Sequence, residues 1–144
     1  MNRRYRIGQW LLVLTSAATP GFQVSVDWYF MGRYHIFNDN WHAHAKYHLI
    51  VYHLTLVIFS AAAIYGCLGR WRWHPFASSF ALFSIVAFWA PYYLAALFPM
   101  ASPYASENEP VPGQLIVGAV LVVIALFGWA LTQSPRLRGA GATA

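Results

Sequence analysis

Residues 115–131 read LIVGAVLVVIALFGWAL and contain no charged side chain. A helix needs about 20 mostly apolar residues to cross the hydrocarbon core of a bilayer. With its flanks this stretch is long enough, and we place a membrane span at about 113–132. Because the run is apolar all round, it predicts a helix whose neighbours are lipid and other apolar helices.

The whole chain has a composition that suits a membrane. Of its 144 residues, 59% are hydrophobic and only 9% are charged, whereas soluble domains carry about 25% charged residues. A soluble domain of this length could not bury so much apolar surface. The net charge of +5 does not indicate nucleic-acid binding, because the basic residues lie in short flanks and form no stripe. We therefore predict a single membrane domain over residues 1–144.

Three further stretches are candidate membrane-spanning helices. The stretch 79–98 is apolar and contains Pro91, which removes a backbone donor and is expected to kink the helix. The stretch 42–68 is strongly apolar in its second half and rich in histidine in its first. The stretch 7–26 is the weakest, because glutamine, threonine and proline interrupt it. The sequence thus predicts an all-α, integral membrane bundle of four transmembrane helices, followed by a loose tail at 134–144.

The first stretch has a rival interpretation as a secretory signal peptide. Arginines precede its short apolar run, as in the start of such signals. The segment 16–18 (Ser-Ala-Ala) is a passable cleavage site, but Pro20 follows almost at once and disfavours cleavage. We expect the helix to be retained.

Charge is distributed unevenly over the segments that connect the four predicted spans. One set of segments holds seven arginines: Arg3, Arg4, Arg6, Arg70, Arg72, Arg136 and Arg138. The other set holds two basic residues and every acidic one: Arg33, Lys46, Asp27, Asp39, Glu107 and Glu109. Short loops rich in Lys and Arg stay in the cytoplasm. The sequence therefore predicts a multi-pass protein of the bacterial inner membrane with cytoplasmic N and C termini.

The histidines gather on the predicted periplasmic side. Five of the six lie between residues 35 and 53: His35, His42, His44, His48 and His53. On a helix with 100° per residue, His44 and His48 share a face, and two imidazoles at that spacing can chelate one metal ion. Asp27 and His35 are the best sources of further ligands. We therefore expect a transition-metal site (Zn, Fe or Cu) made of Asp27, His35, His44 and His48.

Four other residues are additional candidates for this site: His42, His53, Glu107 and Glu109. His53 lies about three turns into its span and needs a hydrogen-bond partner, for which Gln23, Tyr92 and Tyr93 are candidates. Histidine and aspartate also suit proton transfer, because histidine titrates near neutrality. An ionisable group in a membrane usually faces the bundle interior or a wet cavity. The leading hypothesis is a periplasm-facing, metal- or proton-handling site that acts on or binds a lipophilic ligand; the alternative is that the histidines only anchor helix ends.

A different hypothesis makes the chain an accessory or structural subunit of a larger membrane complex, for example a respiratory or photosynthetic one, or of a homo-oligomer. Aromatic residues make up 18% of the chain and could pack against partner helices. Small residues at 61–66, with Gly118 and Gly128, would allow close helix approach. The same residues would also serve packing inside the bundle.

The run from Asp27 to His48 resembles a pattern found in an uncharacterised family of small bacterial four-helix membrane proteins. The matching residues are Asp27, Trp28, His35, Asn38, Trp41, His44, Ala45 and His48. The match covers about 22 residues, and the segment 41–43 (Trp-His-Ala) stands where that family carries a proline-rich stretch. The resemblance implies a four-helix membrane fold with a shared polar site and names no activity. A looser similarity to the sterol-isomerase and sigma-2-receptor group rests on Asp27 alone.

Overall fold

The computed structural model describes residues 3–72, 74–98 and 112–140. In these ranges the chain is entirely helical apart from its connections, as the sequence predicts. The elements are α1 (Arg3–Val24), the π-helical segment η1 (Ser25–Phe30), α2 (Ala43–Leu68), α3 (Pro75–Ala95) and α4 (Gly113–Ala140).

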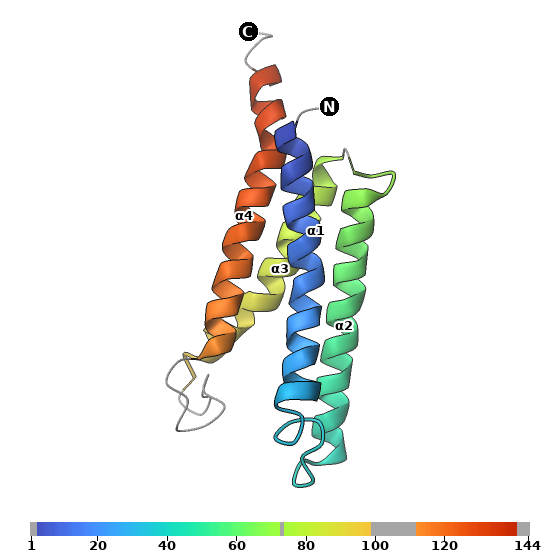
Figure 1. Ribbon diagram of the computed structural model, residues 1–144, viewed down its shortest axis with the longest axis vertical. Coiled ribbons are helices and arrows are strands. Elements are labelled where there is room, and N and C mark those ends of the chain that lie inside the picture. The colour runs from blue at the N-terminus through green and yellow to red at the C-terminus, as the bar shows by residue number, and fades with distance from the viewer. Residues whose placement is uncertain (1–2, 73, 99–111, 141–144) are drawn as a thin grey trace.

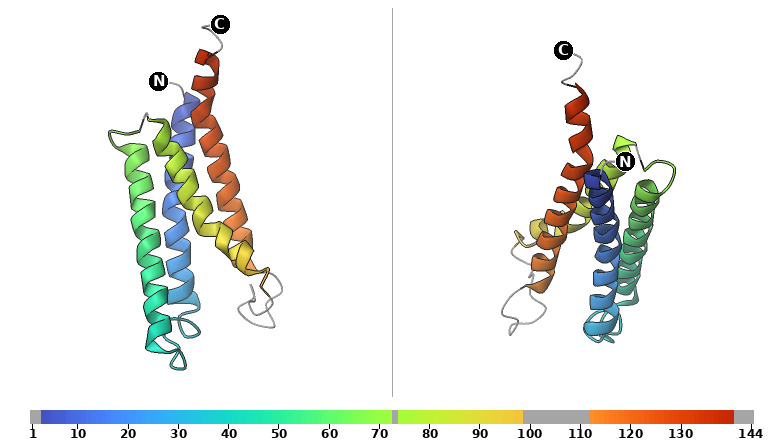
Figure 2. Two further views of the ribbon diagram at one scale, coloured as in Figure 1. Left: turned by 180° about the vertical axis from the view of Figure 1, so that it is seen from behind. Right: turned by 45° about the horizontal axis from the view of Figure 1, so that its top comes forward.

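The helices form one elongated bundle in which α1 packs against all three of the others (Figure 1). The start of α1, the end of α4 and the α2–α3 connection lie at one end of the bundle. The connection from η1 to α2 lies at the opposite end (Figure 2). The arginine-rich segments and the histidine-rich segment are therefore separated by the length of the molecule.

Three of the four helices are long and apolar enough to cross a membrane: Ala43–Leu68, Pro75–Ala95 and Gly113–Gln133. The predicted spans at 42–68, 79–98 and 113–132 correspond to these helices. α1 is not among them, because polar side chains lower its hydropathy. The predicted first span at 7–26 therefore lacks the composition that marks the other three.

Most uncharged polar side chains of α1 and η1 are turned inward. Six polar side chains, that of Asp27 included, are buried: Gln9, Thr15, Ser16, Thr19, Gln23 and Asp27. The outer surface of the bundle carries large apolar side chains instead, such as Ile58 (65% exposed), Phe83 (62%) and Phe127 (59%). A soluble bundle has the opposite arrangement. The distribution suits a bundle whose surroundings are lipid and whose centre holds hydrogen bonds.

Glycines allow the closest helix contacts inside the bundle. A Cβ placed on Gly8 of α1 would lie 2.4 Å from the Gly128 carbonyl oxygen of α4, so the two backbones touch there. A Cβ on Gly118 would lie 2.5 Å from the ring of Trp89, which is fully buried. Gly118 and Gly128 of the fourth predicted span are therefore used for packing within the chain.

The end of α4 differs from the sequence prediction. We expected a loose tail from residue 134, whereas the helix continues to Ala140. Proline 135 lies inside this extension, as Pro20 and Pro91 lie inside α1 and α3. A proline has a helical φ and removes only one backbone donor, and for this reason the residues after it can remain helical.

Candidate functional site

Asp27 lies in η1, where the chain leaves the regular α-helix. The backbone N–H of Met31 donates to the Val26 carbonyl at 2.8 Å, a bond that spans five residues. Such π-helical turns are rare overall, and many of those that occur lie at functional sites. The wider turn changes the direction in which the side chains point. Here the turn places the Asp27 side chain inside the bundle, where the residue is only 3% exposed.

Three N–H groups surround the Asp27 carboxylate. Gln23 Nε2, one turn earlier, donates to Oδ2 at 2.9 Å. His53 Nε2, from α2, contacts the same oxygen at 2.9 Å, and His35 Nδ1, from the connection, contacts Oδ1 at 2.6 Å. When the carboxylate is ionised it can only accept, and both imidazoles then donate to it. We call Asp27, Gln23, His35 and His53 the Asp27 cluster.

Trp28 determines which nitrogen of His53 carries the proton. The indole Nε1–H, which can only donate, lies 3.1 Å from His53 Nδ1. His53 Nδ1 is therefore the acceptor, and in the neutral ring the proton is on Nε2, which faces Asp27. The side chain of His53 is 6% exposed. This histidine is thus a buried donor to the carboxylate with a single defined tautomer.

His35 joins the cluster to the surface of the protein. Its side chain is 23% exposed, against 5% for Asp27, and its ring stacks on Trp41 with centroids 5.8 Å apart. The turn that carries it requires Gly32, because a Cβ there would lie 2.4 Å from the Trp28 carbonyl oxygen. His35 is therefore the member of the cluster that water can reach.

His44 and His48 form a second, separate group. Their Nε2 atoms lie 2.9 Å apart on the first turns of α2, and both residues are exposed. The predicted face-sharing of these two histidines is therefore observed. Among the residues that the structure describes, no hydrogen bond or ion pair joins this pair to the Asp27 cluster.

The structure thus divides the residues that the sequence assigns to one metal site. Asp27 meets His35, as expected, and its second histidine is His53 rather than His44 or His48. Within the described ranges no three His, Cys, Asp or Glu side chains are arranged to hold a metal ion. In the Asp27 cluster the imidazole nitrogens point at the carboxylate oxygens and not at a common point where a metal ion could bind.

Other candidate residues lie elsewhere. His42 precedes α2 as its N-cap residue, is exposed, and makes no capping hydrogen bond. Glu107 and Glu109 lie outside the described residues. The hydrogen-bond partners predicted for His53, which were Gln23, Tyr92 or Tyr93, were wrong. Among the described residues His53 bonds to Asp27 and Trp28 instead.

A pocket of about 380 Å³ opens between α2 and α3 beside the cluster. Its polar groups come from Tyr52, Thr55, Ser84 and Tyr92, and the rest of its wall is apolar. The Tyr52 and Tyr92 hydroxyls hydrogen-bond to each other, and the Tyr52 ring lies 5.4 Å from that of His53. The pocket therefore has an apolar body with a hydroxyl pair on the side of the Asp27 cluster.

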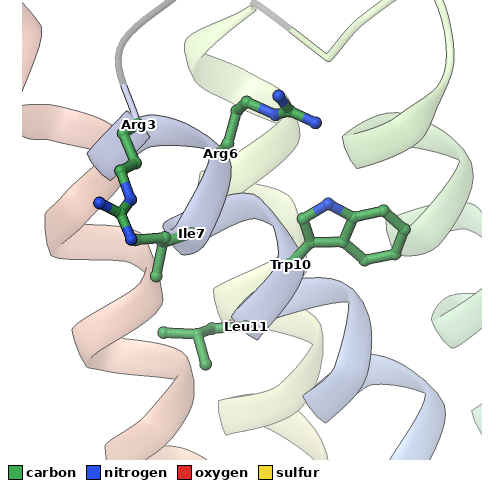
Figure 3. Close-up of a pocket in the computed structure, with 5 residues that line it drawn as sticks. All are labelled: Arg3, Arg6, Ile7, Trp10 and Leu11. Atoms are coloured by element: carbon green, nitrogen blue, oxygen red, sulfur yellow. The ribbon is translucent and has the colours of Figure 1, made fainter.

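A second pocket, of about 430 Å³, lies on the first turns of α1 at the arginine-rich end (Figure 3). It is lined by Arg3, Arg6, Ile7, Trp10 and Leu11, and the two guanidinium groups point in different directions. It contains no histidine or carboxylate, and Trp10 at a helix end is typical of a membrane interface. This groove offers none of the acid–base groups that gather around Asp27.

No family model, curated protein or solved structure matches this chain. The resemblance over residues 27–48 to a family of small four-helix membrane proteins therefore stays a prediction.

Proposed function

We propose that this chain is a multi-pass membrane protein whose Asp27 cluster takes up and releases protons at the periplasmic side of the bacterial inner membrane. The observation that carries the proposal is a buried carboxylate that contacts two histidines, His35 at 2.6 Å and His53 at 2.9 Å. A buried aspartate with histidine partners in a membrane protein is by default a functional group, because its burial is costly.

We propose that all four predicted spans cross the membrane. α1 packs along the other three helices and turns its polar side chains toward them, so the bundle offers lipid an apolar surface despite the low hydropathy of α1. Arginines occupy the end of the bundle that carries both termini, and the cluster occupies the other end. By the preference of Lys and Arg for cytoplasmic loops, the termini lie inside and the cluster opens outward.

The two histidines have different roles in this proposal. A proton from water adds to Nε2 of His35, the nitrogen that does not face Asp27. The Nδ1 proton then passes to Asp27 Oδ1, which leaves neutral His35 and a neutral carboxylic acid. His53 cannot accept this proton easily, because Trp28 donates to its Nδ1 and its Nε2 is already protonated. We therefore assign proton exchange to His35 and Asp27, with His53 as a positioning residue.

Nitrogen NMR of histidine-labelled protein in lipid nanodiscs tests this function. We expect His53 to keep its Nε2–H tautomer while His35 changes from its Nδ1–H form to its Nε2–H form when the cluster takes up a proton, and we expect Asp27→Asn to abolish this change. Asp39→Asn is the control, since Asp39 is exposed in the same connection. The same change of His35 tautomer in wild type and in Asp27→Asn would contradict the proposal.

Metal binding is a second candidate function, at His44 and His48. Metal–nitrogen bonds of about 2.0–2.1 Å allow two nitrogens that lie 2.9 Å apart to bind one Zn²⁺ or Cu²⁺ ion. Their exposed position on a regular helix makes the pair a chelating group of modest affinity. The subunit hypothesis has less support, because Gly118 and Gly128 already pack within the chain.

A further inference from the structure

We propose that the pocket between α2 and α3 binds a neutral, lipid-soluble molecule whose polar end is a carbonyl or hydroxyl oxygen, held by Tyr52 and Tyr92. This inference rests on the proposed function, because it names the kind of ligand that lies beside the Asp27 cluster. The volume of about 380 Å³ is within the range of small-molecule pockets, which are mostly apolar with a few placed polar groups.

The hydroxyl pair gives the pocket a hydrogen-bond donor. Each tyrosine hydroxyl carries one proton, and the bond between the Tyr52 and Tyr92 oxygens uses one of the two. The second proton is then available to an acceptor oxygen in the pocket that both residues line. In an apolar site such a group discriminates strongly between an oxygen-bearing ligand and a hydrocarbon, because an unsatisfied hydroxyl is costly there.

Pro91 changes the backbone hydrogen bonding of α3 where this helix lines the pocket. Pro91 has no N–H, so it cannot donate the usual helical hydrogen bond to the Ala87 carbonyl. Both Pro91 and Ala87 line the pocket. A ligand hydroxyl could therefore donate to the wall while it accepts from a tyrosine, whereas a carbonyl would use the tyrosine alone.

Charge argues for a neutral ligand. Among the described residues that line the pocket, none is basic, so an acidic ligand such as a fatty acid would lack a counter-ion. The Asp27 cluster lies next to this lining, with the His53 ring 5.4 Å from that of Tyr52, and its carboxylate already has three nitrogen neighbours. An ammonium group in the pocket would therefore be desolvated without gaining a free carboxylate.

An unsatisfied acceptor lies between the pocket and the cluster. Gln23 donates from Nε2 to Asp27, while its Oε1 is buried and has no hydrogen-bond partner among the described residues. The Gln23 side chain is also a neighbour of the Tyr92 hydroxyl. A buried acceptor left open is uncommon and is usually met by a water molecule or a ligand. Polar groups thus extend from Asp27 through Gln23 to the tyrosine pair.

Photo-labelling with decylbenzophenone tests the inference on the full chain in lipid nanodiscs. This probe is neutral and apolar, carries one carbonyl oxygen, and cross-links to nearby C–H groups when irradiated. We expect saturable labelling that mass spectrometry maps to residues 52–59 and 84–92. Two competitors are added to a labelled form of the probe: the unlabelled form of the same ketone, and decyldiphenylmethane, which is the same molecule without the oxygen. Decyldiphenylmethane should compete at least several-fold more weakly than the unlabelled ketone.

Two variants separate the pocket from the general apolar surface. Tyr92→Phe removes one hydroxyl and keeps the ring, and should weaken labelling about two- to tenfold, the usual effect of one hydrogen bond. Ala87→Leu should block the pocket and abolish the mapped labelling. The matched controls are Tyr47→Phe and Ala119→Leu, which change exposed residues of α2 and α4 outside the pocket and should leave labelling unchanged.

The outcomes distinguish this inference from the proposed function. Equal competition by ketone and hydrocarbon would show that a lipid acyl chain occupies the pocket and would overturn the inference. Labelling that is spread over the exposed surface and insensitive to Ala87→Leu would overturn it too. Neither result depends on proton exchange at Asp27, which the histidine titration measures separately.

Discussion

The two histidine groups of this protein lie within one stretch of sequence and differ in almost every physical respect. His35 and His53 come from different elements and meet at one buried carboxylate. His44 and His48 come from adjacent turns of one helix and contact each other at an exposed position. Proximity in the sequence therefore says little about which histidines act together. What separates the two groups is which histidines reach the buried carboxyl group of Asp27.

The largest difference between the two groups should appear when Asp27 itself is removed. Asp27→Ala leaves the buried donors of Gln23 and His53, and the partly exposed His35, without their partner, and we expect a loss of about 3 kcal/mol in the free energy of unfolding. SDS titration of the protein in mild detergent measures this change. Asp39→Ala should change stability by less than about 0.5 kcal/mol. If Asp27→Ala changed the stability as little as Asp39→Ala, the two histidine groups would not differ in their contribution to folding.

The next effect concerns the turn that brings His35 to Asp27. Gly32→Ala puts a Cβ within 2.4 Å of the Trp28 carbonyl oxygen, which must move together with the connection. We expect a loss of about 2 kcal/mol in stability. Gly21→Ala is the control, because nothing lies within 4 Å of its Cβ and alanine favours a helix. If both variants had the stability of wild type, Gly32 would not define the geometry of the cluster.

A smaller effect should follow from the loss of the Trp28 hydrogen bond. Trp28→Phe removes the donor to His53 Nδ1, which should cost about 1 kcal/mol and allow both neutral tautomers of His53. Nitrogen NMR would then show a mixture at His53 in place of the Nε2–H form. Trp10→Phe, at the other end of α1, should leave the His53 signals unchanged. A single tautomer that persists in Trp28→Phe would mean that Asp27 alone orients this ring.

The exposed pair should have the smallest effect on folding. We expect His48→Ala to change stability by less than about 0.5 kcal/mol, since the side chain is exposed. Chelation at the pair should be lost in the same variant, with Zn²⁺ or Cu²⁺ affinity at least several-fold lower by calorimetry. His42→Ala is the matched control for metal affinity. Equal affinity in wild type and His48→Ala would exclude the pair as a metal site.

Long apolar stretches made most of the fold predictable. The spans at 42–68 and 79–98 lie within a few residues of α2 and α3, because lipid-facing helices need apolar side chains on every side. α1 was less clear, since its glutamines and threonines read as interruptions. The structure shows their use: Gln9 Nε2, for example, donates to the Cys67 and Arg72 carbonyls where α2 ends. Such contacts between helices leave no periodic signal in one sequence.

The site was predicted in part for a related reason. The pairing of His44 with His48 follows from helical periodicity, and the grouping of Asp27 with His35 follows from their shared end of the bundle. That His53 is the second partner of Asp27 could not be derived, because it depends on how α1 and α2 are aligned and on the π-helical turn at Asp27. The signal in the sequence was the position of His53 about three turns inside a span, where a histidine needs a hydrogen-bond partner.

The inward-facing polar side chains of α1 also have a consequence for the order of assembly. α1 is synthesised before α2, yet the carbonyls that accept from Gln9 belong to residues 67 and 72, and one ring that contacts Asp27 belongs to residue 53. Until α2 has emerged, α1 would expose these polar groups to lipid, which opposes its insertion alone. We therefore expect α1 to enter the bilayer together with α2 as a hairpin, and a chain shortened to its first helix to remain at the membrane surface.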